Sequence, residues 1–476
     1  MKEIIKIAWK NVWRNKKRSV TVVVAVILGI SAGIFACGVM QGWVEQRIDA
    51  VIYIENGRIK LYNPDFLNNE EINNVIPNKE AVEHFLNKET VIKAFSERVK
   101  LMAMATTSRG STSLMLQGIN IDDEKKVSKL YTCLLQGTYF EEETSRPVLI
   151  SDKTAEQLRI KNYVLTTEIL DSLENTASIP NTVIASLRSI ENIRFESENK
   201  MKKEISSLLD RKDVSKYGFD VLKMSEQYRL RSKIVFTFTD KQGELVNQIY
   251  KVCGVYKTAN IMYDQSNAFV LKSDLSTIAG LNEGEIHETG IILRENANEE
   301  NVQSAIKKAF PELSVLTWKE LSPDASLVSE YMSIYLFIFV GIILFALAFG
   351  IINTMLMAIL ERTKELGMLM AIGMNRKRVF SMIMLETVFL TMAGAVAGML
   401  AGWLLIQVTG MTGLNFSSFV DGFEAMGWAA IVYPTIDLFF FFGITVLVIV
   451  TGVLSSIIPA RKALSLNPVE AIRMNN

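Results

Sequence analysis

Four apolar stretches dominate the hydropathy pattern of this chain. The first, 20–40, contains no charged residue, and three more follow much later, at 331–360, 379–408 and 436–458. Each stretch is long enough to cross about 30 Å of hydrocarbon as an α-helix. The pattern therefore predicts four transmembrane helices, with a large segment between the first and the second.

That large segment, 41–330, has the mixed pattern of a folded domain in water. β-rich runs alternate in it with helical patterns, the runs at 234–239, 268–271 and 290–293 and the helices at 79–87, 153–159 and 298–310. Asp240 to Gly243 is predicted to turn a hairpin, and Asn298 to cap a helix. We expect an α+β domain in two lobes. Residues 161–230 are charged and helix-prone, and we interpret them as an insertion or a mobile subdomain.

Residues 1–19 are predicted to begin with an amphipathic helix. Its apolar and basic residues separate onto two faces at 100° per residue: Ile4, Ile5, Ala8, Trp9 and Val12 on one, and Lys2, Lys6, Lys10 and Arg14 on the other. Tryptophan and lysine on such a helix suit a membrane surface. A cleavable signal peptide is the alternative, but no convincing small-x-small site follows the first apolar stretch.

Charge is segregated along the chain, although 51 Lys and Arg balance 51 Asp and Glu overall. The basic residues are in excess in 1–19, in 361–378 and in 459–476, whereas 41–330 has a net charge of −7. The positive-inside rule then places both termini and 361–378 in the cytoplasm, and 41–330 and the loop 409–435 outside. Nothing in this distribution supports nucleic-acid binding.

The sequence offers little for catalysis. No phosphate-cradling glycine loop followed by Lys-Ser or Lys-Thr is present, so ATP hydrolysis by that route is excluded. The two histidines, His84 and His287, lie far apart in sequence, and we expect each to be an ordinary surface residue. We therefore predict a subunit of a larger assembly and not an enzyme.

A few polar or reactive residues stand inside or next to the spans. Glu386 is expected to face the membrane interface or to pair with a basic residue of 376–378. Cys37 is expected to pack as a small apolar side chain in the first span. A disulfide between Cys133 and Cys253 is possible if 41–330 faces an oxidising compartment, and the sequence leaves this open.

The segment 361–378 is more than a turn between two spans. It has five Lys and Arg against two Glu, around an apolar middle at 366–374 that contains two glycines. Such a helix can lie on the membrane surface or insert into a groove on a cytosolic partner. The alternative is a basic loop that only sets the topology. We favour docking of a partner.

Several stretches carry a family resemblance. They are Trp13–Arg18 after the amphipathic helix, the run Glu361–Met374, and the tail segments Pro459–Ala463 and Asn467–Arg473. Together with the order of one span, a large domain and three spans, they make the chain resemble the MacB/FtsX-like permeases of ABC transporters, the type VII or mechanotransmission class. The resemblance covers nearly the whole chain except 161–230. It implies an α-helical membrane protein with four transmembrane helices and a large extracytoplasmic α+β domain, of the MacB-like periplasmic core type, inserted between helices 1 and 2.

The resemblance also implies partners and site residues. A cytosolic ABC ATPase would dock on a coupling helix at 361–378, through Glu361, Arg362, Glu365, Leu366, Gly367, Leu369, Gly373, Met374 and Arg378. A C-terminal motif would comprise Pro459, Arg461, Pro468 and Glu470. ATP and magnesium would be bound by that ATPase, so this chain is expected to be non-catalytic and to hold no cofactor or metal. A second copy or a paralogue would complete a dimer in the bacterial inner membrane, with both termini cytoplasmic and the large domain periplasmic.

Within the class, the segment Gly57–Pro64 resembles one in lipoprotein-releasing permeases of the LolC/LolE type, although Arg58 and the insertion depart from them. The resemblance thus implies extraction of a lipoprotein and its transfer to a periplasmic carrier. Three alternatives stay open: an FtsX-like regulator of a cell-wall hydrolase, MacB-like efflux or export, and a membrane receptor without an ATPase. No fused ATPase domain is seen, which speaks against MacB itself, and the length speaks against FtsX proper.

Overall fold

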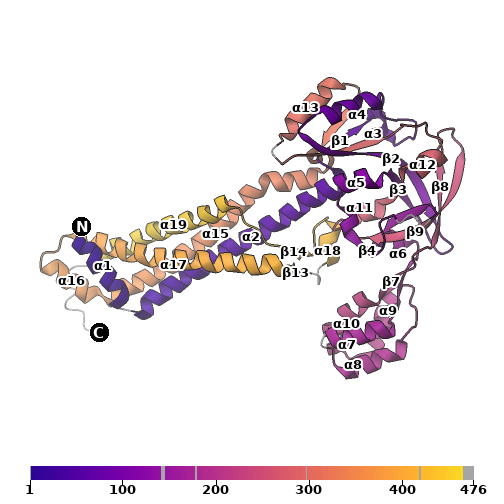
Figure 1. The fold of residues 1–476 in the computed structure, drawn as a ribbon. Helices are drawn as coiled ribbons and strands as arrows, with labels where there is room; N and C mark the ends of the chain where they lie inside the picture. The colour runs from indigo at the N-terminus through magenta and orange to yellow at the C-terminus, as the bar shows by residue number, and fades with distance from the viewer. Residues whose placement is uncertain are drawn as a thin grey trace. The chain divides into compact units, whose positions relative to one another are not determined.

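The computed structural model describes residues 2–14, 16–140, 145–176, 179–295, 297–416 and 420–464. The chain divides into two compact units (Figure 1). The helical unit is made of 1–47, 327–420 and 429–476, and the sheet unit of 48–326 and 421–428.

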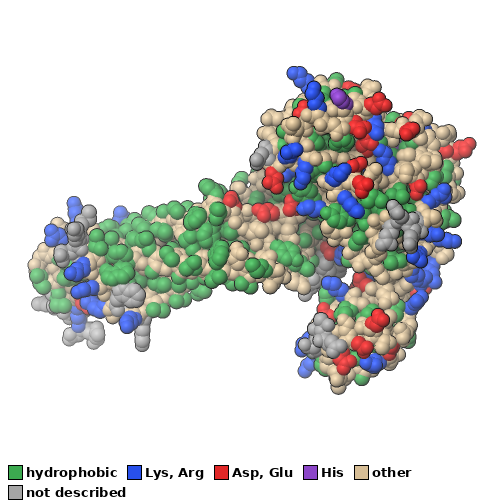
Figure 2. Space-filling model, viewed as in Figure 1, with side chains coloured by type: hydrophobic (Ala, Val, Ile, Leu, Met, Phe, Trp, Pro, Cys, Tyr) green, Lys and Arg blue, Asp and Glu red, His purple; other side chains and the backbone are tan. Residues whose placement is uncertain are grey.

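The helical unit contains four helices that are long and apolar enough to cross a membrane. Its helices are α1 (Lys2–Arg14), α2 (Lys16–Ala50), α15 (Pro323–Glu361), α16 (Thr363–Ala371), α17 (Arg376–Thr412) and α19 (Leu438–Leu464). Helices α2 and α15 extend beyond the predicted spans 20–40 and 331–360, because hydropathy marks only the lipid-facing part of a helix whose hydrogen bonds continue into polar flanks. In Figure 2, hydrophobic side chains cover much of these helices, and Lys and Arg gather at the end where α1 and α16 lie.

Helix α17 packs on α2 along three glycines four residues apart, which we call the glycine seam. A β-carbon added to these glycines would lie 2.7, 2.8 and 3.0 Å from side-chain atoms of α2, at the pairs Gly394–Val26, Gly398–Ile30 and Gly402–Ile34. Such distances are too short for a real side chain. The seam therefore brings the two helix backbones closer than any larger residue would permit.

The sheet unit is built on a ten-stranded mixed sheet in the order β12-β1-β11-β2-β3-β10-β5-β9-β4, with β8 paired to both β2 and β9. The strands are β1 (Ile59–Tyr62), β2 (Ile92–Thr106), β3 (Ser111–Ile119), β4 (Leu134–Gly137), β5 (Pro147–Ser151), β8 (Lys233–Thr239), β9 (Leu245–Tyr256), β10 (Asn267–Leu271), β11 (Glu288–Leu293) and β12 (Ser314–Thr317). Only the pairs β3–β10 and β5–β9 are parallel. The three predicted runs correspond to β8, β10 and β11, and Asp240–Gly243 joins β8 to β9 as predicted.

Short helices surround this sheet. They are η1 (Val51–Asn56, a π-helix), α3 (Pro64–Asn69), α4 (Lys79–Lys88), α5 (Ile121–Val127), η2 (Leu130–Cys133), α6 (Asp152–Gln157), α11 (Ile261–Ser266), α12 (Lys272–Ile278), α13 (Glu299–Ala309), α14 (Trp318–Leu321) and α18 (Val420–Ala425). The side chain of Asn298 accepts a hydrogen bond from the backbone N–H of Asn301 at 3.1 Å, so the predicted cap of α13 is confirmed. In the predicted loop 409–435, β13 (Leu414–Asn415) pairs with β14 (Ile431–Val432).

The predicted insertion is a helical lobe with a hydrophobic core of its own. Its elements are β6 (Lys161–Tyr163), α7 (Thr167–Thr176), α8 (Asn181–Leu187), η3 (Arg188–Ile190), α9 (Glu198–Leu208), α10 (Arg211–Ser225) and β7 (Glu226–Tyr228). Strands β6 and β7 pair with each other, so the chain enters and leaves the lobe through one two-stranded neck. The four α-helices cluster together beyond β7 in Figure 1.

One histidine differs from its prediction. His84 is exposed, but His287 is completely buried next to the first residue of β11. Its Nδ1 accepts the N–H of Lys100 at 3.2 Å and its Nε2 lies 2.9 Å from the carbonyl oxygen of Ile72. Burial lowers the pKa of His287, so the ring is neutral and serves as a structural hydrogen-bonding group. A lone histidine in a short polar run gave no sign of this burial.

The three cysteines form no disulfide in the described chain. Cys37 is buried in α2, as predicted for a small apolar side chain. The Sγ of Cys253 donates instead to the carbonyl oxygen of Val148 at 3.3 Å, and Cys133 lies in η2. The pairing of Cys133 with Cys253 that the sequence left open is therefore not formed in this structure.

A buried charge cluster joins β1, β2 and β11. Glu288 is completely buried and contacts three cations: Arg98 at 2.6 Å, Lys100 at 2.6 Å and Lys60 at 3.3 Å. Arg98 also pairs with Glu124 at 2.7 Å. Burial alone would raise the pKa of Glu288, but Lys100, Lys60 and Arg98 together hold it well below its ordinary value. Below about pH 7, where Lys60 is protonated, three cations face two carboxylates and the cluster has one excess positive charge.

Replacing Lys60 by methionine is expected to raise the free energy of unfolding near pH 7 and to flatten its pH dependence. Burial, with Lys100 and Arg98 close by, lowers the pKa of Lys60 from 10.5 to about 7 despite Glu288. The folded protein therefore binds the proton of Lys60 more weakly than the unfolded chain does. The resulting loss of folding stability is fully present below pH 7 and shrinks as the pH rises toward 10.5. The slope of unfolding free energy against pH should drop by up to about 1.4 kcal/mol per pH unit in the variant. Pulse proteolysis of the full-length protein in urea measures both slopes, and equal slopes would contradict the prediction.

Candidate functional site

Helix α16 is set apart from its neighbours by two breaks in the backbone. Arg362, between α15 and α16, leaves helical geometry with φ −106° and ψ 17°. After α16, Gly373 has φ +103°, a conformation that residues with a β-carbon rarely adopt. The side chain of Asn375 then accepts the N–H of Lys377 at 3.0 Å and caps α17. The predicted segment 361–378 is thus a nine-residue helix held between a kink and a capped turn.

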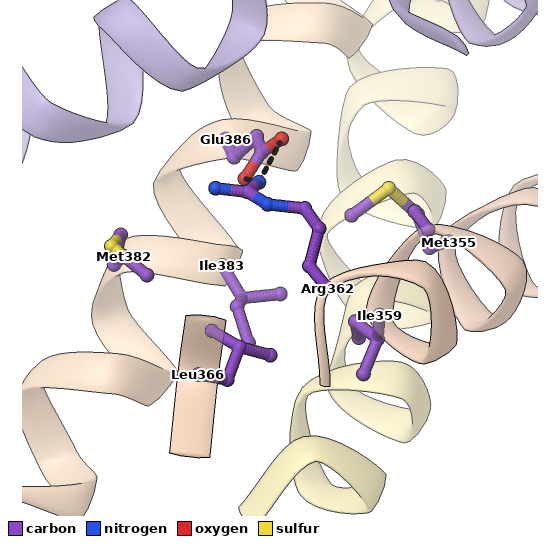
Figure 3. Close-up of a pocket in the computed structure, with 8 residues that line it drawn as sticks. Met355, Ile359, Arg362, Leu366, Met382, Ile383 and Glu386 are labelled. Atoms are coloured by element: carbon purple, nitrogen blue, oxygen red, sulfur yellow. Dashed lines mark hydrogen bonds and ion pairs between the residues drawn. The ribbon is translucent and has the colours of Figure 1, made fainter. Parts of the chain in front are cut away.

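The inner side of α16 packs into the helical unit. Leu366 and Gly367 are buried, and Leu369 and Met374 are half-buried against the same core. Leu366 faces a small pocket whose lining includes Met355, Ile359, Met382 and Ile383 (Figure 3). Four residues that the sequence assigned to docking therefore contribute partly or wholly to anchoring the helix.

A series of ion pairs holds the inner side of α16 in place. The Nε of Arg362 donates to Glu365 at 3.1 Å, and its terminal nitrogen contacts Glu386 of α17 at 3.2 Å (Figure 3). Arg14 of α1 also pairs with Glu365. Glu386 is only 2% exposed. The sequence predicted that Glu386 faces the membrane interface or pairs with a basic residue of 376–378. In the structure it is buried against Arg362 instead, because the kink after α15 turns Arg362 inward, whereas Arg378 is exposed.

Helix α1 belongs to the same site. Ala8 and Val12 of its predicted apolar face are buried, and the ring of Trp9 meets Phe389 of α17 edge-on at 5.4 Å. Partial burial would raise the pKa of Glu365, but hydrogen bonds from Arg362 and Arg14 lower it below its ordinary value. Glu365 is therefore ionised at neutral pH and links α1 to α16 as a salt bridge.

The outer side of α16 combines apolar and basic residues. Ile372 is 86% exposed and Met368 is 50% exposed. Lys364 and Arg378 are exposed close to them in sequence, as are Glu361 and Gly373. We call Met368, Ile372 and these charged neighbours the outer face of α16. Sequence reasoning did not select Met368 or Ile372, because all apolar residues of the segment look alike until the helix phase is known.

The C-terminal motif is only partly described. Pro459 lies inside α19 and is buried, and Arg461 is exposed in the last turns of that helix. Pro468 and Glu470 lie outside the described residues. Among the residues that the structure describes, no cluster of His, Cys, Asp or Glu could hold a metal ion.

Comparison with known proteins identifies the three-span part of the chain. Residues 337–468 match the family "FtsX-like permease C-terminal". This FtsX-like region contains α16, α17 and α19 and most of α15. The chain is similar to ABC transporter permeases of the FtsX and MacB type.

Three relatives illustrate the similarity. An uncharacterized ABC transporter permease, MJ1507 of Methanocaldococcus jannaschii, is 30% identical over 49% of this chain and 58% of its own length. The macrolide export ATP-binding/permease protein MacB of Escherichia coli is 28% identical over 46% of this chain and 33% of its own length. The uncharacterized ABC transporter permease YknZ of Bacillus subtilis is 26% identical over 51% of this chain and 59% of its own length. The matches thus span between about a third and three fifths of each relative.

The structures of two related domains align with this chain weakly. The extracellular domain of YknZ from Gram-positive bacteria covers 55% of this chain and 99% of its own length, at 14% identity and a TM-score of 0.29. The periplasmic region of MacB from Actinobacillus actinomycetemcomitans covers 56% of this chain and 90% of its own length, at 11% identity and a TM-score of 0.28. These scores are too low to establish a shared fold.

Proposed function

We propose that this chain is the permease subunit of an ABC transporter and that a cytosolic ABC ATPase docks on the outer face of α16. In this proposal α16 and both termini lie in the cytoplasm and the sheet unit lies outside. Two permease copies, or one copy and a paralogue, act as a dimer. The ATPase binds ATP and magnesium, and this chain transmits the resulting movement without catalysing a reaction.

The observation that carries the proposal is the two-sided construction of α16. An isoleucine that is 86% exposed on a short helix is costly in water and is explained by a partner surface that covers it. Behind it, Arg362 joins Glu365 to Glu386 of α17, and Leu366 is buried. A push on the outer face would therefore pass into α17 and α1 through ion pairs and packing, and not into a loose loop.

Replacing both Met368 and Ile372 by glutamate is expected to abolish association with the ATPase and the stimulation of its ATP hydrolysis. The reason is that two charges would have to be buried in an interface built for apolar side chains. The matched control is Met426→Glu, since Met426 is 71% exposed but follows α18 in the sheet unit and is not part of the outer face of α16. Co-purification and ATPase assays measure the effect. A double variant that binds the ATPase as well as the control does would refute docking at α16.

Two transport functions and one regulatory function fit such a permease. Export is supported by the similarity to proteins named macrolide export ATP-binding/permease protein MacB. Release of lipoproteins to a carrier is supported only by the resemblance of Gly57–Pro64, which forms β1 and the capped start of α3 in the sheet unit. Activation of a cell-wall hydrolase needs no substrate path at all. We place export first.

Affinity purification of the tagged full-length protein in mild detergent, followed by mass spectrometry, separates these functions. An ATPase together with an envelope-spanning tunnel protein would support export, and an ATPase with lipoproteins would support release. An ATPase with a cell-wall hydrolase would support regulation. If no ATPase is retained while the protein is intact, the permease proposal is overturned.

A further inference from the structure

The neck of the helical lobe is the two-stranded ribbon of β6 and β7, extended by an isolated bridge to Phe195, and it has two different faces. Strand β6 pairs with β7, with Asn162 opposite Gln227, and Tyr163 also exchanges hydrogen bonds with Phe195 at 2.9 Å. Residues opposite each other share a face, and successive residues alternate between faces. The pairing therefore sets every side chain of the ribbon on one face or the other.

One face of the neck is neutralised. Lys161 lies 2.8 Å from Asp152 and 3.2 Å from Glu226, and the hydroxyl of Tyr228 donates to Asp152 at 2.8 Å. One cation therefore contacts two carboxylates there. The polar groups on this face thus already have partners within the chain, and they offer no site for an anion.

The opposite face carries arginines. Asn162 lies on this face because side chains alternate along β6. Arg229 lies there too, since its backbone N–H bonds to the carbonyl oxygen of Ile160 and continues the pairing of β7 with β6. Arg194 and Glu196 flank Phe195 in the bridge to Tyr163, so they share the same face. Arg109, in the turn between β2 and β3, reaches this face from the sheet and donates to Glu196 at 3.0 Å. We call Arg109, Arg194 and Arg229 the neck arginines. Figure 2 shows Lys and Arg side chains gathered beside the position of β7.

The neck arginines lack enough acceptors. Arg229 donates to the Oδ1 of Asn162 at 3.2 Å, but its Nε is buried without any acceptor. Among the described residues, no carboxylate forms a salt bridge with Arg194 or Arg229, and Glu196 is shared between Arg109 and Lys200. Burial, and then repulsion from Arg109 and Arg194, lowers the pKa of Arg229, although Glu196 raises it. A buried donor without a partner is unfavourable, and an incoming acceptor would remove this cost.

We propose that the neck arginines bind the phosphate group of an anionic ligand. Guanidinium groups present paired N–H donors that match phosphate oxygens, and three of them on one face favour a group with several charged oxygens. Arg109 belongs to the sheet, Arg194 to the lobe and Arg229 to the neck that joins them. A bound phosphate group would therefore tie the lobe to the sheet, an effect independent of ATPase docking on α16.

The test is calorimetric titration of the purified full-length protein in neutral detergent with inorganic phosphate at constant ionic strength. We expect saturable binding at one site, weakened at least about tenfold by Arg229→Ala or Arg194→Ala, since a charge-assisted hydrogen bond contributes about 1.5–3 kcal/mol. Glu196→Gln should tighten binding several-fold, because it removes the competing carboxylate; a purely structural glutamate predicts no such gain. Arg188→Ala is the control, since Arg188 is an exposed arginine of the same lobe whose nearest carboxylates are Asp171 and Glu174.

A second arm identifies the source of the phosphate group. The protein is mixed with phosphatidylcholine vesicles with or without phosphatidylglycerol, and hydrogen exchange of the neck is followed. Protection by phosphatidylglycerol vesicles that is lost in Arg229→Ala supports a lipid headgroup, and protection by inorganic phosphate alone supports a soluble phosphate compound. The proposal is overturned if neither probe binds, or if Arg229→Ala binds both probes as the Arg188→Ala control does.

Discussion

Replacing Glu288 by alanine is expected to destabilise the sheet unit by about 3–5 kcal/mol, because it leaves buried cations without their counter-charge. Glu288 is the common partner of Lys60, Arg98 and Lys100, and only Glu124 would remain. Hydrogen exchange of β1, β2 and β11 in the full-length protein measures the loss as faster exchange throughout these strands. Because its pKa is lowered on folding, the contribution of Glu288 is present above pH 4.5 and is lost as the pH falls further.

The matched control for this prediction is Glu283→Ala. Glu283 is exposed and lies in the loop just before β11, so its removal should change stability by no more than about 0.5 kcal/mol. Adding Lys60→Met to Glu288→Ala should recover part of the stability, since it removes one of the unpaired cations. Equal exchange in Glu288→Ala and Glu283→Ala would show that the buried cluster contributes nothing.

Replacing Arg362 by alanine should destabilise the helical unit by a comparable amount, about 3–5 kcal/mol, and should uncouple the ATPase. Glu386, which is 2% exposed, would lose its ion pair with Arg362 at 3.2 Å in a buried site. Thermal unfolding of the detergent-solubilised protein measures the first effect, and stimulated ATP hydrolysis measures the second. The control is Lys233→Ala, which removes an exposed basic side chain of β8 in the sheet unit and leaves α16 unchanged.

A double variant separates the two roles of Arg362. Arg362→Met with Glu386→Leu replaces the buried pair by apolar side chains of similar size, so stability should return to near the wild-type value. Coupling should stay defective, because Glu365 keeps only Arg14 as its partner and α16 is no longer tied to α17 by charge. Full recovery of both properties would mean that the pair only fills space.

The large-scale organisation could be predicted from the sequence because it depends on long, local patterns. Four long apolar stretches predicted four spans, and the change of composition at 161–230 marks the segment whose helices have a hydrophobic core of their own. The capped helix at Asn298 is also a local signal. The position of the candidate site followed in the same way, since basic residues flank an apolar segment between two spans.

The contacts within the site could not be predicted, because they depend on which side chains the fold brings together. Helix α16 has apolar residues around its whole circumference, so the sequence could not tell buried Leu366 from exposed Ile372. The partner of Glu386 is decided by the kink at Arg362, which is a backbone feature. Likewise, the sequence around Lys60 could not predict that Glu288 is its partner, because the two residues are brought together by the pairing of β1 with β11.

The glycine seam has a consequence for any sliding between α2 and α17. Gly394, Gly398 and Gly402 accept side chains of α2 that share their four-residue repeat, and a repeat of four corresponds to about 6 Å of helix rise. A smaller shift along the axis would press Val26 or Ile30 against residues that have side chains. A shift of one whole repeat would return two of the three α2 side chains to a glycine, but it would set the third against Leu390 or Ile406. The seam therefore favours a single axial register, and α2 and α17 are expected to move together and not to slide past each other.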